Sequence, residues 1–405
     1  MDFGLSTGQR SLRAEVIAFA RKNLAQDLAA GDRDGGFPAE DWRRCAAFGV
    51  LGWPVPAEHG GRGLDPLDTI IALEALGYGC RDNGLVFAIN NHLWGCAIYL
   101  IEHGTPEQKR RYLRPMCDGR LVGAHALSEP EAGSDVLSVQ TTARREGDHY
   151  VLSGTKCFIS NGPVADVFLT MARTGNGGDG GSGQDQLSAF LVTADLPGVR
   201  KAGELRKLGL RTCPMGVVEL DNVPVPAANL IGREGAGYSI FSATIEWERA
   251  FMFASHVGAM QRLLEASIKH ARSRRQFGRP IGSFQAVAHP IADMKIRLEL
   301  ARLLLYQVGW LKREGRLALL EATMAKIFIS ESLVATAMAA VEVHGARGYV
   351  SDAGSDTGSG AVAGIDGTGM ERELRDALGA PIYAGTSAVQ RGILAELLGL
   401  QGSLR

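Results

Sequence analysis

The spacing of apolar residues changes twice along this 405-residue chain, and that change constrains the fold more than any other feature. Up to about residue 122 the apolar residues recur at helical spacing. From Gly123 to about Pro226, short β-type runs alternate with Gly, Asn and Asp. Long helical patterns then return. This order predicts three units in one subunit, over residues 1–122, 123–235 and 236–405.

The individual elements follow from periodicity, from capping residues and from turn signals. Ser6 or Thr7 is a candidate cap for the first helix, and Thr105 precedes a proline at a first helical position. Two glycine-rich tracts, residues 174–186 and 351–369, are predicted to be surface loops. The remaining helices are predicted over residues 66–77, 83–103, 238–272, 283–313, 317–343 and 386–398, and strands over 149–152, 167–170, 187–193 and 217–220.

Bulk composition narrows the class of protein. The formal net charge of -1 argues against nucleic acid or an anionic membrane as the main partner. No run approaches eighteen uninterrupted apolar residues, and the first residues do not resemble an export signal, so we expect a cytoplasmic protein without a membrane span. The six cysteines lie far apart without a C-x-x-C pair, which predicts buried thiols and no metal site.

Four segments, in this order and spacing, cover nearly the whole chain. They are GAHALSEPEAGSD from Gly123, KCFISNG from Lys156, RRQFGRPIG from Arg274, and RDA from Arg375 followed by IYAGTS from Ile382. The set resembles the acyl-CoA dehydrogenase family. The resemblance implies a mainly α fold with a middle β-domain: a helical N-terminal domain, a β-barrel-like middle domain and a C-terminal four-helix bundle. It also implies FAD, and a homodimer or homotetramer in which a neighbouring subunit completes each FAD site.

The physical needs of FAD agree with these segments. Its pyrophosphate needs donors, and its flat ring needs apolar walls with a few polar groups. Two simpler readings remain open from the residues alone: a tight turn before an ordinary strand at residues 125–134, and a solvated charged helix end at Arg274. The usual glutamine and glycine of the family are replaced here by Glu342 and Ala346. By resemblance, the residues that hold FAD are His125, Leu127, Ser128, Phe158, Ile159, Ser160, Arg274, Gln276, Gln285, Glu342, Gly345, Thr386 and Ser387.

The largest departure from the family concerns the catalytic base. Most members carry a glutamate where this chain has Ala384, and a dehydrogenase of this type needs a base for the α-proton. A minority carries the base on an earlier helix before an arginine, and Glu248 followed by Arg249 matches that arrangement. An alanine still offers its backbone N–H to a thioester carbonyl. The resemblance thus implies Glu248 as base and a substrate site of Ser134, Arg249, Ala384 and Gly385. Without it, Glu248 reads as a helix-surface glutamate paired with an arginine.

The same departure bears on the acyl group. The sequence around Trp247 and Glu129, with Ala384, resembles the branch that oxidises prolyl groups on carrier proteins in secondary metabolism. The partner would then be an aminoacyl thioester on a carrier protein, with an electron-transfer flavoprotein or oxygen as acceptor. Three alternatives stay open: a short- or branched-chain acyl-CoA dehydrogenase, a flavin monooxygenase on the same fold, and a catalytically silent flavin-binding protein.

Overall fold

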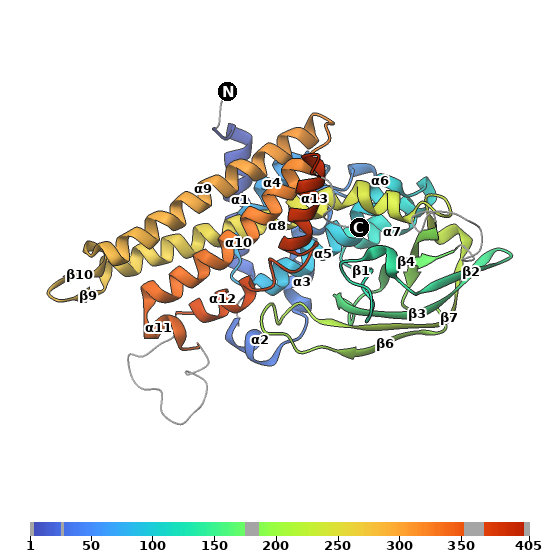
Figure 1. Ribbon diagram of the computed structural model, residues 1–405, viewed down its shortest axis with the longest axis horizontal. Coiled ribbons are helices and arrows are strands. Elements are labelled where there is room, and N and C mark those ends of the chain that lie inside the picture. The colour runs from blue at the N-terminus through green and yellow to red at the C-terminus, as the bar shows by residue number, and fades with distance from the viewer. Residues whose placement is uncertain (1–3, 26–27, 175–185, 352–367, 401–405) are drawn as a thin grey trace.

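The computed structural model describes residues 4–25, 28–174, 186–351 and 368–400. It has the predicted order of helical, sheet and helical parts (Figure 1). Most of the two glycine-rich tracts, residues 175–185 and 352–367, lies outside the described residues, so the loops predicted there are not described either. All six cysteines are buried, as predicted.

The first part consists of helices with local start signals. In α1 the Ser6 hydroxyl accepts from the Gln9 N–H while the Gln9 side chain accepts from the Ser6 N–H, a reciprocal cap. Thr105 and Gln108 repeat this device before α7. The helices are α1 (Thr7–Asn23), α2 (Leu28–Asp34), α3 (Ala39–Phe48), α4 (Pro66–Gly79), α5 (Asn83–His92), α6 (Ile98–His103) and α7 (Pro106–Cys117).

The predicted helix over residues 83–103 contains one wide turn. α5 and α6 are joined by a single π-helical stretch, Leu93–Ala97, and such stretches occur frequently at functional sites. Asn83–His103 and Leu319–His344 are the two described segments long and apolar enough to cross a membrane. However, 94% and 61% of their apolar windows are buried within the protein, which accounts for their composition.

The middle part is one mixed sheet. Its strands follow the order β6-β7-β3-β2-β4-β5-β8, and β1 lies parallel to β4. The strand predicted over residues 187–193 is confirmed, whereas β3 and β7 are longer than predicted because their pairing, with two irregularities, extends from His149 opposite Pro226 to Ser160 opposite Met215. The bounds are β1 (Gly123–Ala126), β2 (Thr142–Glu146), β3 (His149–Ser160), β4 (Val167–Arg173), β5 (Leu187–Thr193), β6 (Val199–Glu204), β7 (Met215–Pro226) and β8 (Leu230–Ile231).

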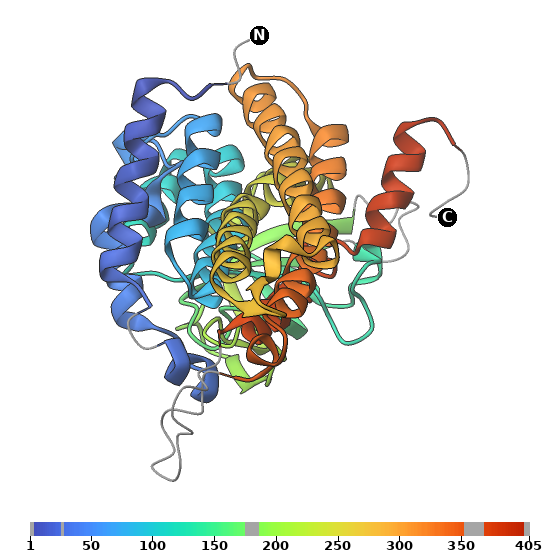
Figure 2. The ribbon, with the colours of Figure 1, turned by 90° about the vertical axis from the view of Figure 1, so that its left-hand side faces the viewer.

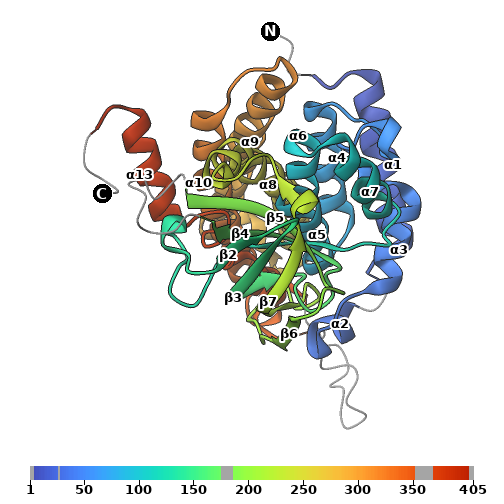
Figure 3. The same ribbon diagram turned by 90° about the vertical axis from the view of Figure 1, so that its right-hand side faces the viewer.

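Three long helices dominate the last part. α8 (Gly237–Ser273) has 37 residues, and α9 (Gln285–Arg313) and α10 (Leu319–His344) pack beside it. A small hairpin of β9 (Arg275–Gln276) and β10 (Arg279–Pro280) joins α8 to α9 at one tip of the molecule (Figure 1). The last described helices are α11 (Ala346–Tyr349), α12 (Met370–Ala377) and α13 (Ser387–Leu397), and α13 lies at one side of the bundle (Figures 2 and 3), where Arg391 pairs with Glu331 on α10.

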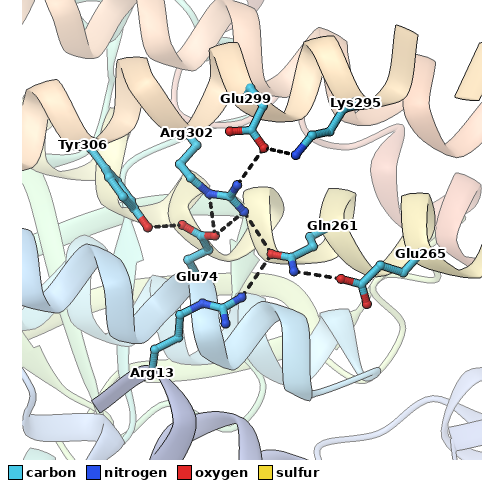
Figure 4. A network of polar contacts seen from close by, with 8 residues as sticks. All are labelled: Arg13, Glu74, Gln261, Glu265, Lys295, Glu299, Arg302 and Tyr306. Atoms are coloured by element: carbon cyan, nitrogen blue, oxygen red, sulfur yellow. Dashed lines mark hydrogen bonds and ion pairs between the residues drawn. The ribbon is translucent and has the colours of Figure 1, made fainter. Parts of the chain in front are cut away.

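A polar network connects the first and last helical parts. The Glu74 carboxylate on α4, only 1% exposed, accepts from Arg302 Nη2 at 2.7 Å and from the Tyr306 hydroxyl at 2.8 Å on α9 (Figure 4). Arg302 also donates to Gln261 on α8, and Gln261 accepts from Arg13 on α1. These bonds join four helices around one buried carboxylate. The same helices share a hydrophobic core that also includes the helix-facing side of β4 and β5.

Candidate active site

Glu248 lies on α8, and it is buried rather than exposed on the helix surface. The residue is 9% exposed, and Arg249 beside it is 7% exposed. Its Oε2 atom has no hydrogen-bond partner among the described residues. Nδ1 of His125 lies 3.9 Å from this atom. A buried carboxylate oxygen without a protein partner is costly, and this cost is typical of a functional group.

Burial sets the charge states of this group. Loss of hydration raises the pKa of Glu248 to about 7, and the neighbouring Arg249 opposes that rise. Burial, aided by the Lys156 charge, lowers the pKa of His125 to about 4, so its imidazole is neutral at pH 7. The result is a carboxyl group that ionises near neutrality, next to an uncharged imidazole. A pKa near the working pH is what a general base requires.

Two glycines allow the strand that carries His125 to pack closely against the π-helical stretch. His125 is on β1, and the π-helical stretch packs against that strand. A Cβ on Gly95 would lie 3.1 Å from the His125 Cβ, and a Cβ on Gly123 would lie 2.8 Å from that of Cys96. Larger residues at these two positions would push the helix away from the strand. The close packing brings the Tyr99 ring to 5.3 Å from the His125 ring.

Aromatic side chains pack against one another around this part of α8. Trp94 and Trp247 are parallel, with ring centroids 6.3 Å apart, and Phe251 packs against both at 4.8 Å. The Phe241 ring lies 6.4 Å from that of His125. Sequence reasoning missed Trp94, Tyr99, Phe241 and Phe251. Their spacing within apolar helices is indistinguishable from that of ordinary core residues, so no sequence signal could have found them.

The residues predicted to face the flavin form one continuous surface. The Cys157 N–H donates to the Ser128 carbonyl at 2.9 Å, and the buried Lys156 ammonium donates to the Leu127 carbonyl at 3.1 Å and to Glu129 at 2.7 Å. These bonds fix the loop after β1 against the end of β3. Ile159 and Ser160 are buried at that end.

Phe158 is the exposed member of this surface. The pairing of β3 with β7 slips between Lys156 and Ile159, and Phe158 there has a φ of 57°, which is unusual for a bulky residue. Its ring is turned outward, and the residue is 62% exposed. The exposed Phe158 ring, held by a strained backbone, lies beside half-buried Leu127 and Ser128. Together these residues can form one wall of a site for a flat apolar ring system. The residues present therefore fit a flavin.

The segment around Ala384 is held against α8 beyond Glu248. Ala384 and Gly385 have positive φ angles of 54° and 83°, and the Ala384 carbonyl accepts from Gln390 at 3.1 Å. Tyr383 packs on Phe253 with centroids 5.5 Å apart and bonds to His256. Thr386 uses its hydroxyl to cap α13, which Ser387 opens. Ser134, by contrast, is exposed on the turn after Glu129.

The other predicted cofactor residues lie at the far end of the bundle. Arg274, Gln276, Gln285, Glu342 and Gly345 are all exposed there. The rings of His270 and His344 stack at 4.4 Å, which joins the ends of α8 and α10. Arg274 follows Glu248 by 26 residues, so at the rise of a helix the two are about 39 Å apart. The two groups of predicted cofactor residues therefore lie far apart within one chain.

Comparisons with known proteins agree on the kind of protein this is. The family models described as the N-terminal, middle and C-terminal domains of acyl-CoA dehydrogenase match residues 6–120, 124–223 and 235–399. An L-prolyl-[peptidyl-carrier protein] dehydrogenase of Pseudomonas fluorescens is 39% identical, over 99% of this chain and all of that one.

Two solved structures are similar along the whole chain. The prolyl acyl carrier protein oxidase AnaB is 44% identical, with a TM-score of 0.92 over 98% of this chain and 100% of that chain. A structure of PigA with FAD and proline is 36% identical, with a TM-score of 0.91 over 99% and 100%. The predicted fold, with helical, sheet and helical domains, is thus confirmed. On the three matching domains and the full-length relatives, the chain belongs to the acyl-CoA dehydrogenase family of oxidoreductases that act on CH–CH bonds.

Proposed function

We propose that this chain is an FAD-dependent dehydrogenase that oxidises the α,β C–C bond of a prolyl-like aminoacyl thioester on a carrier protein. The observation that carries the proposal is the buried Glu248 carboxylate, whose Oε2 has no partner among the described residues. The named substrates of the similar proteins, a prolyl carrier protein and proline, support the acyl group.

In this mechanism Glu248 removes the proton from the α-carbon of the acyl group. The carboxylate accepts that proton through Oε2, and its pKa of about 7 makes it a competent base in neutral solution. The backbone N–H of Ala384 donates to the thioester carbonyl and stabilises the developing enolate. FAD, when bound, supplies the acceptor for the hydride that leaves the β-carbon. The carboxyl group of Glu248 returns its proton to solvent afterwards.

The aromatic residues favour a small acyl group. Trp94, Tyr99 and Phe251 are fully buried, and the Tyr99 ring packs 5.3 Å from the ring of His125, which lies beside Glu248. A five-membered ring is compact and packs well against aromatic faces. This supports a prolyl-like substrate over a fatty acyl group. Size alone does not distinguish a prolyl group from the butyryl group of a short-chain acyl-CoA dehydrogenase, because both are small.

Two separated groups of residues point to more than one subunit at each site. His125, Leu127, Ser128 and Phe158 would hold the flavin ring beside Glu248 of the same chain. Arg274, with Gln276, Gln285 and the Glu342–Gly345 segment, would then contact the pyrophosphate and adenosine of a neighbour's FAD. A planar guanidinium suits a phosphate pair. A homodimer or homotetramer with two-fold symmetry provides this exchange.

Anaerobic titration tests the reaction itself. The purified holoprotein is mixed with prolyl carrier protein, prolyl-CoA, butyryl-CoA and isovaleryl-CoA, and loss of flavin absorbance is followed. We expect the prolyl carrier protein to reduce the flavin fastest. Equal rates with prolyl-CoA would favour a free CoA substrate, and faster rates with butyryl-CoA or isovaleryl-CoA would favour an ordinary acyl-CoA dehydrogenase. Reduction by no thioester would favour a monooxygenase or a silent flavoprotein.

Three related predictions stay open. The borders of the domains at residues 122/123 and 235/236, the cytoplasmic location and the use of an electron-transfer flavoprotein as acceptor are proposals of the same kind. The acceptor is tested by re-oxidation of the reduced protein with an electron-transfer flavoprotein in place of oxygen.

A further inference from the structure

Tyr99 carries a buried hydroxyl with no hydrogen-bond partner among the described residues, next to the candidate base. The residue is 0% exposed, and its ring lies 5.3 Å from that of His125. His125 in turn reaches to 3.9 Å from Glu248. Neither Nε2 of His125 nor Oε2 of Glu248 has a partner within the described residues either. Three polar groups of one cluster, from α6, β1 and α8, are therefore left without partners.

Such a cluster is costly unless a ligand satisfies it. A buried polar group without a partner costs about 1–3 kcal/mol, and most buried hydroxyls are bonded. Tyr112, equally buried on α7, has a partner at 3.2 Å in Asn229. Burial and the nearby Glu248 charge raise the pKa of Tyr99, so its hydroxyl stays protonated. The group can both donate and accept one hydrogen bond.

We infer that the Tyr99 hydroxyl binds the α-nitrogen of the aminoacyl substrate and makes the protein selective for aminoacyl over plain acyl thioesters. The inference rests on the proposed function, in which Glu248 takes the α-proton. The nitrogen is one bond from that carbon, so it must lie close to Glu248 and its immediate neighbours. Tyr99 is the hydroxyl of this cluster. A fully buried group that requires a nitrogen partner disfavours an analogue with carbon in its place.

The test compares two substrates that differ in one atom. Prolyl and cyclopentanecarbonyl thioesters of the same pantetheine are used to reduce the flavin of the wild type, Tyr99→Phe and the control Tyr112→Phe. In Tyr99→Phe we expect reduction by the prolyl thioester to slow about tenfold, as for one lost hydrogen bond, while the cyclopentanecarbonyl rate changes less than about twofold. Tyr112→Phe should keep the wild-type ratio of the two rates. An unchanged ratio in Tyr99→Phe, or an equal fall for both substrates, would overturn the inference.

A binding measurement does not depend on turnover or on the variant's stability. The amide analogues of both thioesters, with nitrogen in place of sulfur, are titrated into wild-type holoprotein by calorimetry. We expect the prolyl analogue to bind about tenfold more tightly than the cyclopentanecarbonyl analogue, and equal affinities would contradict the role of Tyr99. If no thioester reduces wild-type flavin, the proposed function fails, whereas a lost preference between the two analogues refutes only the inference about Tyr99.

Discussion

Glu248 lies within α8 and Arg274 directly follows that helix, but their surroundings differ. Glu248 is buried beside His125 and Tyr99, and burial shifts its pKa to about 7. Arg274 ends α8 in the open, beside an exposed hairpin, and its charge is not buried within one chain. The part of α8 around Glu248 therefore has the environment of a chemical site within a single subunit. The hairpin end of α8 offers hydrogen-bond donors for a phosphate, but they are exposed to solvent. We expect a second subunit to cover them.

The largest effect is expected from a substitution of Glu248. Glu248→Gln keeps the shape of the side chain but cannot accept the α-proton, so reduction by the prolyl thioester should slow roughly a hundredfold or more. FAD content should stay at the wild-type level. Glu299→Gln, on the partly exposed surface of α9, is the control and should keep the wild-type rate. Wild-type kinetics in Glu248→Gln would eliminate this residue as the base and strengthen the monooxygenase reading.

The role of Arg274 is tested next, by FAD binding and by mixing of variant chains. Arg274→Ala should bind FAD roughly 30-fold more weakly, about 2 kcal/mol, because a charged hydrogen-bonding pair with the pyrophosphate is lost. Co-folded chains carrying Glu248→Gln and Arg274→Ala should then recover activity. One site in each mixed dimer combines an intact Glu248 from one chain with an intact Arg274 from the other. If activity did not recover in mixed dimers, Glu248 and Arg274 would act in the same chain, and the contrast drawn between the two regions would be wrong.

A smaller, graded effect is expected from pH. Only the ionised Glu248 accepts a proton, and burial raises its pKa to about 7, so the rate should fall as pH drops through that value. Below about pH 7, kcat/KM should decrease about tenfold per pH unit, and above it should level off. The cyclopentanecarbonyl thioester is the suitable substrate, because it carries no amine that titrates. A profile that stays flat down to about pH 5 would mean that the carboxyl group is not buried as described.

The smallest effect on chemistry is expected from the polar network between the two regions. Glu74→Ala removes the buried acceptor of Arg302 and Tyr306, which should reduce the free energy of unfolding by about 3 kcal/mol. Glu107→Ala, in the exposed pair with Arg110, should change it by less than about 0.5 kcal/mol. Chemical denaturation measures both. Since neither residue touches the site, the rate of flavin reduction below the transition should be unchanged, and a large loss of rate in Glu74→Ala would show that the network also positions Glu248.

Much of the fold could be predicted from sequence because its signals are local. A hydroxyl before a helix, as at Thr386, and alternation within a strand, as at residues 187–193, are set by hydrogen bonds and side-chain directions within a few residues. The π-helical stretch at Leu93–Ala97 was missed because its wide turn depends on packing against β1. The pairing of β1 with β4 was missed for the same reason, since parallel partners are far apart in sequence.

The sequence by itself determined the family, the order of helical and β parts, and the choice of Glu248 as the candidate base where Ala384 cannot serve. It did not determine that Tyr99 and His125 lie beside Glu248, or that Arg274 is about 39 Å away along α8. Those facts belong to the tertiary structure. Burial, and with it the pKa of the carboxyl group, depends on which residues the fold brings together from positions 99, 125 and 248, and no local pattern in the chain contains that information.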